Sequence, residues 1–219
     1  MKTRMPLLVA LCTPWRATAQ PSEWPFRIVT VGGEVEVYRK TAGTWSAAML
    51  RADLQPGDGA RTREGRLTLR TVSGQALRLA LLSRVSLLEA GAPDQPTRVR
   101  VEGGSVWAAV MPGSPPREQI EAQTGAVTVT VRGGGMSVSV GRDGSVLVRV
   151  YHGAVECAGP GAGRQWTRAL AGEQELSVAG DGVPGDVRAL KRDKLEAAWA
   201  KWNEEQDLAG GYGGKPPAR

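Results

Sequence analysis

The chain has very little of the chemistry that builds reactive sites. Among its 219 residues there is a single histidine, His152, and there are two cysteines, Cys12 and Cys157. A zinc site takes about four Cys or His ligands, so these residues cannot form one without several carboxylates. A Ser/His/Asp triad would have to use His152, and no Gly-x-Ser-x-Gly elbow occurs in the sequence. We therefore predict a protein that is not an enzyme, with no catalytic residues, no metal and no cofactor.

Long apolar runs and runs of Lys or Arg are also missing. After the first 19 residues, no segment approaches the roughly 20 apolar residues that cross a bilayer, so we expect no transmembrane span in the mature chain. The formal charge is +6, but three basic residues and no acid lie within the first 19 residues. Without them, 25 basic residues face 22 acidic ones. We therefore expect no nucleic-acid partner.

The N-terminus has the composition of an export signal. A basic start precedes a short apolar run and the small residues Ala-Thr-Ala, which end at Ala19. This pattern predicts a signal peptide over residues 1–19 and a periplasmic or secreted protein. Two alternatives stay open: a disordered tail, and a lipoprotein anchored at Cys12. The residue before that cysteine is Leu11, whereas a lipidation signal has a small residue there.

Residues 26–180 read as a succession of β-strands. Stretches such as "AVTVTVRGGGMSVSV" alternate apolar and polar residues, and Gly, Pro and Asp interrupt them about every ten residues. This pattern predicts an all-β body, either a β-helix-like solenoid or a sandwich-like stack of short strands. The "RGGG" motif is followed by a strand, whereas a phosphate-binding loop requires a helix there. We interpret its glycines as a tight turn or bulge between strands.

The C-terminal part of the sequence changes to a helical pattern. Residues 186–208 contain no Gly or Pro, and Asp186 is a candidate N-cap. Their bulky apolar residues recur at helical spacing and predict a stripe that docks the helix on the β body, the alternative being a partner protein. The residues of this stripe are Leu195, Trp199 and Trp202. Residues 209–219 are rich in Gly and Pro, and we expect them to be disordered.

Tryptophan is over-represented relative to phenylalanine, with seven Trp and one Phe. Trp suits buried cores and binding surfaces alike, and core packing is the more common use. Three of the seven lie in the β body and are our candidate binding residues: Trp45, Trp107 and Trp166. Cys157 lies on one face of a strand and is expected to be a small buried hydrophobe.

Several phrases of the sequence resemble the FecR domain family, in the order in which that family has them. The opening phrases are "GEVEV" at 33–37, "WSAA" at 45–48, "GDGART" at 57–62 and "GRLTL" at 65–69. Later phrases are "VRVEGGSVWAAV", "IEAQTGAVTVTVRGGGMSVSV", "GSVLVRVYHGAVEC" and the closing "WAKWNEEQD". The sequence departs from the family pattern at Ala60, Gly125, Gly134 and Met136. The resemblance extends over most of residues 28–208.

The resemblance implies an all-β, β-helix-like body in the periplasm or outside the cell. In the namesake of the family, such a domain is part of a transmembrane sensor that relays iron-siderophore status to a sigma factor. We expect no complete sensor here, because the chain has neither the cytoplasmic segment nor the membrane span of that relay. The resemblance supplies no catalytic residues.

Two function classes follow. The first is a non-catalytic, exported signalling module that binds a protein or a cell-envelope component, for example by adding a partner strand to a sheet edge. The second is a glycan- or peptidoglycan-binding domain or a glycan-active enzyme. The enzyme would need two carboxylates facing each other across a cleft.

Overall fold

The structure is a computed structural model that describes most of the chain from residue 26 to residue 212. The described ranges are 26–71, 73–89, 96–114, 118–161, 163–192 and 194–212, and the side chain of Leu195 also falls outside the description. The predicted signal peptide, Cys12 and the end of the predicted disordered tail therefore lie outside the described residues.

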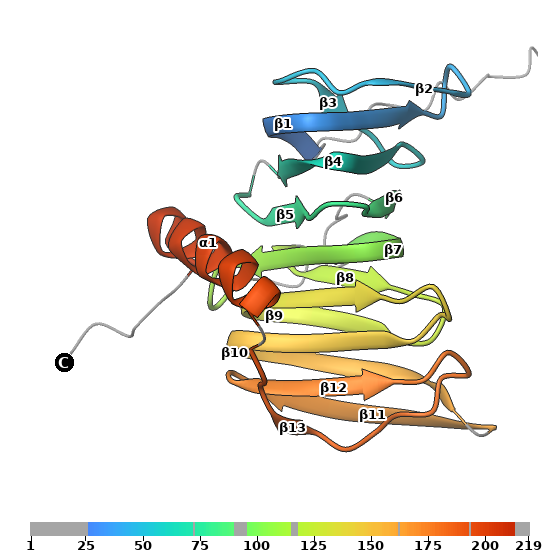
Figure 1. The fold of residues 1–219 in the computed structure, drawn as a ribbon, viewed down its shortest axis with the longest axis vertical. Coiled ribbons are helices and arrows are strands. Elements are labelled where there is room, and N and C mark those ends of the chain that lie inside the picture. Colours follow the sequence, from blue (N-terminus) through green and yellow to red (C-terminus); the bar gives the residue numbers. More distant parts are fainter. Residues whose placement is uncertain are drawn as a thin grey trace, which may run out of the picture.

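The described residues form thirteen strands and one helix (Figure 1). The strands are β1 (Phe26–Arg39), β2 (Thr44–Ala47), β3 (Asp53–Leu54), β4 (Gly59–Arg70), β5 (Ala76–Leu79), β6 (Arg84–Glu89), β7 (Thr97–Val110), β8 (Ile120–Gln123), β9 (Thr128–Val140), β10 (Val146–Gly161), β11 (Arg164–Ala171), β12 (Gln174–Val178) and β13 (Arg188–Ala189). The helix is α1 (Lys194–Gly210). The predicted all-β class with one C-terminal helix is confirmed.

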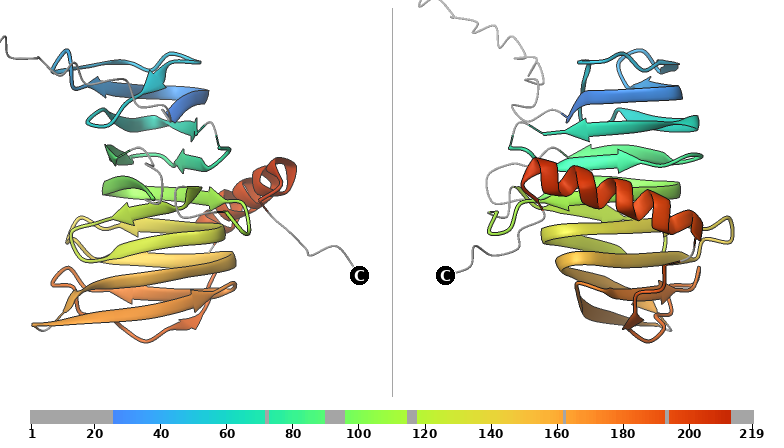
Figure 2. Two further views of the ribbon diagram at one scale, coloured as in Figure 1. Left: turned by 180° about the vertical axis from the view of Figure 1, so that it is seen from behind. Right: turned by 60° about the vertical axis from the view of Figure 1, so that its left-hand side comes forward.

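The strands pair into one continuous sheet that folds into two facing walls. All pairings are antiparallel except that of β7 with β8. Wall A contains β3, the start of β1, the end of β4, β5, the ends of β7 and β9, the start of β10, β12 and β13. Wall B contains β2, the end of β1, the starts of β4, β7 and β9, β6, β8, the end of β10 and β11. The stack is therefore a flattened solenoid whose long strands belong to both walls (Figure 2).

Glycines bend the long strands from one wall into the other. Gly134 in β9 lies opposite Gly153 in β10, with φ of +111° and +81°. A Cβ on Gly153 would lie 2.0 Å from the carbonyl oxygen of Gly133, so the two backbones cross more closely than any side chain allows. Some of the expected short strands are joined here into single long, bent strands. The "RGGG" motif lies inside β9 as a bend, and no helix follows it.

The hydrophobic core fills the space between the walls. Alternate residues of every long strand point inward, as the period-two pattern predicts. Inward residues of wall B include Val99, Val129 and Cys157, and those of wall A include Leu77 and Val138. All five are buried within one cluster. Outward residues of wall A, among them Trp107 and Tyr151, form a second, smaller buried cluster with residues of α1.

The segment before α1 departs from the predicted helix. We expected a helix from Asp186, but residues 183–189 run beside β12 instead. Glu175 pairs with Arg188 in a short ladder, and the Gly185 N–H donates to the Ser177 carbonyl. These backbone groups gain partners along the edge of wall A, which a helix start at Asp186 would have left unpaired.

Residues 209–212, the described part of the predicted disordered tail, are ordered. The helix continues to Gly210, and Tyr212 is buried beside wall A, where its hydroxyl donates to the carbonyl of Gly74. Figure 1 shows α1 lying across the outside of the stack at the level of β5, β7 and β9. Of the described residues, no helical stretch combines the length and hydropathy that a bilayer crossing requires.

Candidate functional site

The helix is attached to wall A through one buried carboxylate, that of Asp207. Its side chain is 0% exposed and meets three strands at once. Arg78 Nη1 of β5 donates to it over 2.6 Å, and Trp107 Nε1 of β7 over 2.9 Å. His152 Nε2 of β10 lies 3.0 Å from the second oxygen. A carboxylate in this position needs such partners, because an unpaired buried charge is very costly.

Aromatic rings and small residues shape the surface below the helix. Trp107 stacks on Tyr151, with ring centroids 4.3 Å apart. Burial raises the pKa of the Tyr151 hydroxyl, which donates to Glu196 at the start of α1. Beside the rings, Ala109 and Gly135 occupy neighbouring strands. A Cβ on Gly135 would lie 2.5 Å from both the Asp207 carboxylate and the His152 ring, so only glycine leaves room for this contact.

Ion pairs fix the two flanks of the helix. Arg149 of β10 pairs with Glu196 and with Glu175 of β12. Arg192, just before the helix, pairs with Glu204 over 2.9 Å and also with Glu173. Hydrogen bonding to Glu204 is the largest cause that raises the pKa of Arg192. Glu196 and Glu204 of α1 are therefore paired with basic residues of wall A and of the segment before the helix.

The predicted docking stripe contributes to this contact through Trp199, which packs against the buried cluster that contains Trp107 and Tyr151. Trp199 and Trp202 are partly buried and stack on each other, with ring centroids 5.5 Å apart. The guanidinium of Arg66 lies over both rings at 5.7 and 5.6 Å. The side chain of Leu195 lies outside the description. Polar residues at the centre of the contact, Asn203 and Asp207, were missed from sequence, because an apolar stripe was taken as the docking face.

The structure separates the three candidate binding tryptophans. Trp107 is 0% exposed and lies under α1. Trp45 is partly buried on the outside of wall B, with its ring over Gly59 and the guanidiniums of Arg61 and Arg84 at 4.3 and 5.2 Å. These positions are far apart in the strand order, so the tryptophans do not form one site.

Trp166 has a structural setting at the opposite end of the stack. It is partly buried against the core, and its Nε1 donates to the carbonyl of Gly182 over 2.9 Å. A Cβ on Gly159 would lie 3.2 Å from its ring, and one on Gly161 would lie 3.0 Å from Nε1. The ring therefore lies across two glycines and closes this end of the core.

His152 and Cys157 do not form a nucleophilic pair. His152 faces outward toward Asp207, whereas Cys157 is fully buried between the walls. Burial raises the pKa of the Cys157 thiol to about 12, so it stays protonated at neutral pH. Among the described residues, no group of three or more His, Cys, Asp or Glu side chains is arranged to hold a metal ion.

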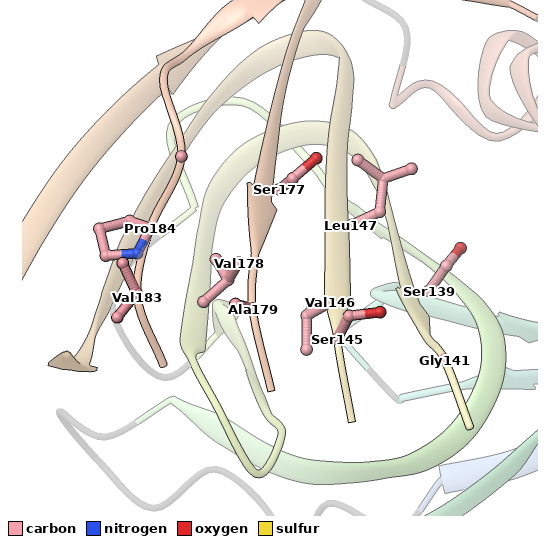
Figure 3. Close-up of a pocket in the computed structure, with 11 residues that line it drawn as sticks. Ser139, Gly141, Ser145, Val146, Leu147, Ser177, Val178, Ala179, Val183 and Pro184 are labelled. Carbon is pink, nitrogen blue, oxygen red and sulfur yellow. The ribbon is translucent and has the colours of Figure 1, made fainter. Parts of the chain in front are cut away.

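A hollow of about 610 Å³ opens at the end of wall A (Figure 3). Its lining combines apolar side chains with serine hydroxyls and contains no charged residue. The residues are Ser139, Gly141, Ser145, Val146, Leu147, Ser177, Val178, Ala179, Val183, Pro184 and Gly185. Such a surface lacks the convergent acid and base groups that catalysis requires.

The edge strand β11 offers backbone groups instead of side-chain chemistry. It pairs with β10 from Ala154 to Gly161, and six of its eight residues are exposed. Within the described part of the chain, no strand pairs with its other side. The corresponding edge of wall A is covered, because β13 pairs with β12. Wall B therefore ends, in the described part of the chain, in an edge strand with no second strand partner, and such an edge can accept a further strand.

The fold and the surfaces described here define a two-walled, all-β solenoid with a docked C-terminal helix. Residues 58–156, from the start of β4 into β10, match the model of the FecR protein family. The FecR resemblance is therefore confirmed for this part of the chain.

Two solved structures share this fold. Both are crystal structures of a candidate anti-sigma factor from Parabacteroides distasonis ATCC 8503, determined at 2.50 and 1.65 Å resolution. The first is 17% identical, with a TM-score of 0.51 over 70% of this chain and 74% of the other. The second is 17% identical, with a TM-score of 0.50 over 69% and 73%. At this identity the likeness is one of fold. No curated protein matches the sequence.

Proposed function

We propose that this chain is an exported, non-catalytic regulatory module, and that it binds a protein partner by strand addition at β11. The open edge of β11 is the observation that carries the proposal. Strand addition uses main-chain hydrogen bonds for affinity and side-chain pockets for specificity. The FecR match over residues 58–156 supports a role in signalling.

The charge of the edge indicates which strands it would accept. Arg164 and Arg168 are exposed on β11, and this strand carries no acidic residue. Basic residues on an edge discourage pairing with a second copy of the same strand, since like charges would face each other. An extended segment with acidic residues would have complementary charge. We therefore expect an acidic or neutral partner strand.

Site-specific photocrosslinking in the producing cells tests this function. A photoreactive amino acid at Thr167, exposed on β11, should give a defined adduct with one envelope protein. The matched control is the same amino acid at Lys201, exposed on α1. No adduct at Thr167, or the same adducts from both positions, would contradict strand addition at this edge.

Mass spectrometry of the mature N-terminus tests the exported state. We expect the chain to begin at Gln20, after removal of residues 1–19. A chain that retains Met1 in the cytosolic fraction would refute export, and a lipid on Cys12 would identify an anchored form.

Glycan binding is the second candidate, and the surroundings of Trp45 favour it. The ring lies on the outer surface between two arginines, and Trp faces stack well on apolar surfaces of ligands. Sedimentation with purified peptidoglycan should then retain the wild type and release Trp45→Ala. If the wild-type protein does not sediment with peptidoglycan, the hypothesis of glycan binding is wrong.

A further inference from the structure

Wall A is a complete sheet without its helix. Its ladder runs uninterrupted from β4 through β5, β7 and β9 to β10. Among the described residues, no backbone–backbone hydrogen bond joins α1 to any strand. The helix is held by side chains alone, so its departure would leave every strand pairing of the wall in place.

The surface under α1 has the composition of a binding site. It presents Trp107, Tyr151, Arg78 and His152 on the outer side of three strands. Trp, Tyr and Arg are the residues most enriched at the energetic centres of protein interfaces. The arginine and histidine can also be hydrated when uncovered. An open state would therefore expose a binding surface without leaving a charge buried and unpaired.

The same surface is shaped and charged for an acidic helix. Ala76, Ala109 and Gly135 lie side by side on β5, β7 and β9, and let a helix backbone approach closely. The basic side chains around them include Arg78 and Arg149, whose partners on α1 are acidic. Recognition of an amphipathic helix by a groove is a recurrent mode of protein binding.

The contact between α1 and wall A leaves several hydrogen-bond donors unsatisfied. Three donors near the helix are buried without a hydrogen-bond acceptor among the described residues: Arg70 Nε, Arg78 Nη2 and Trp199 Nε1. Unsatisfied buried donors weaken a contact. The last turn of α1 has no basic residue, and Asp207 lies near that end, where the helix dipole disfavours negative charge. Another helix that satisfied these donors would compete with α1.

We propose that α1 is a displaceable cover over a binding groove in wall A, and that the competing ligand is an acidic amphipathic helix of a partner protein. The groove is distinct from the β11 edge, since it lies on the other wall. The two sites can therefore succeed or fail separately in experiment.

A labelled peptide of residues 190–212 is the probe for this groove. Fluorescence anisotropy should show that it binds the full chain carrying Asp207→Asn at least tenfold more tightly than the wild-type chain, because the internal competitor is weakened. Asp186→Asn, a change at an exposed residue, is the control chain and should behave as wild type. The same peptide with its own Asp207→Asn change should lose at least tenfold in affinity. Equal binding of the probe to the two chains, or equal binding of the two peptides, would overturn the proposal.

Hydrogen exchange on the wild-type protein tests the opening itself and does not depend on a variant. Amides of α1 should exchange at least a hundredfold faster than those of β9, because the helix leaves while the wall stays folded. If the amides of α1 and β9 exchange at the same rate, α1 leaves wall A only on global unfolding, and the proposal of a displaceable helix is wrong.

Discussion

The carboxylate of Asp207 joins one helix to three strands. Replacing it by Asn keeps the shape but leaves the Arg78 charge buried without its counter-ion. Losing one partner of a buried ion pair typically costs about 3 kcal/mol or more, and undocking of α1 limits the loss here. We expect Asp207→Asn to lower the free energy of unfolding in urea by about 2–3 kcal/mol. Asp186→Asn should change it by less than about 0.5 kcal/mol. Equal effects would mean that the buried pair does not stabilise the fold.

Gly135 makes the Asp207 contact sterically feasible. A methyl group there would lie 2.5 Å from the carboxylate and from the imidazole of His152. We expect Gly135→Ala to loosen α1 and cost about 1–3 kcal/mol, since one of these groups must move. Gly103→Ala is the matched control in β7, because its added Cβ meets nothing within 4 Å. Near-ultraviolet circular dichroism, to which the stacked Trp107 contributes along with the other aromatic residues, should change only in the first variant.

The thiol of Cys157 should not react with alkylating reagents in the native protein. With its thiol pKa raised to about 12, the thiolate is a very small fraction at pH 8. We expect peptide mapping after iodoacetamide treatment to find Cys157 unmodified in native protein and fully modified in urea. Rapid native labelling would show that the core opens around this residue.

The residue roles could be predicted from sequence only in part. Cys157 was correctly expected to be buried, because its apolar neighbours fix the inward face of a strand. Asp207 was not found, since a charged residue in a charged helix looks solvated. The missed signal is that the row Glu196, Ala200, Asn203 and Asp207 recurs at helical spacing. Only Ala200 in this row is apolar, and polar docking cannot be inferred from hydrophobic periodicity.

At the scale of elements, glycines decide where strands bend. The sequence indicated most of the strand runs, but it missed β2, β3 and β11. Positive φ serves a turn and a bend equally well, so the joining of runs into long strands was not predictable. The strand pairing determines where β9 and β10 bend, because the two halves of each strand pair with neighbours in different walls. The segment 186–192 was misread as helix because it lacks Gly and Pro, and edge pairing with β12 outweighed its helix propensity.

Among the bends, the point where β9 crosses β10 should be the most sensitive to replacement of its glycines. In Gly153→Ala the new methyl would meet the Gly133 carbonyl at 2.0 Å, in addition to adopting a φ of +81°. We expect a loss of about 3 kcal/mol or more, from collision and backbone strain together. Gly163→Ala isolates the strain, because φ is +76° there and nothing lies within 4 Å; about 1 kcal/mol is expected. Similar urea midpoints for the two variants would show that the close crossing relaxes at little cost.

At the scale of the whole molecule, acid should destabilise the protein, and salt should reduce the effect. The pKa of Glu36 is lowered by its hydrogen bond from Arg61, and that of Asp53 by its hydrogen bond from Arg27. A lowered folded-state pKa contributes stability that is present above the unfolded value and is lost as pH falls through the folded value. The net charge of +6 also rises as the 22 carboxylates are protonated, which adds self-repulsion.

We therefore expect a melting temperature that is level above about pH 5 and falls steadily below about pH 4.5. Because Glu36 and Asp53 are surface groups, their share is small, and 0.5 M NaCl should shrink the slope by screening. Glu36→Gln provides the internal control. Its melting temperature should lie below that of the wild type at neutral pH. The difference between the two melting temperatures should vanish in acid, because the wild-type carboxylate takes up its proton. A difference in melting temperature that stays constant from neutral pH into acid would mean that the Arg61 pair does not contribute to the acid sensitivity.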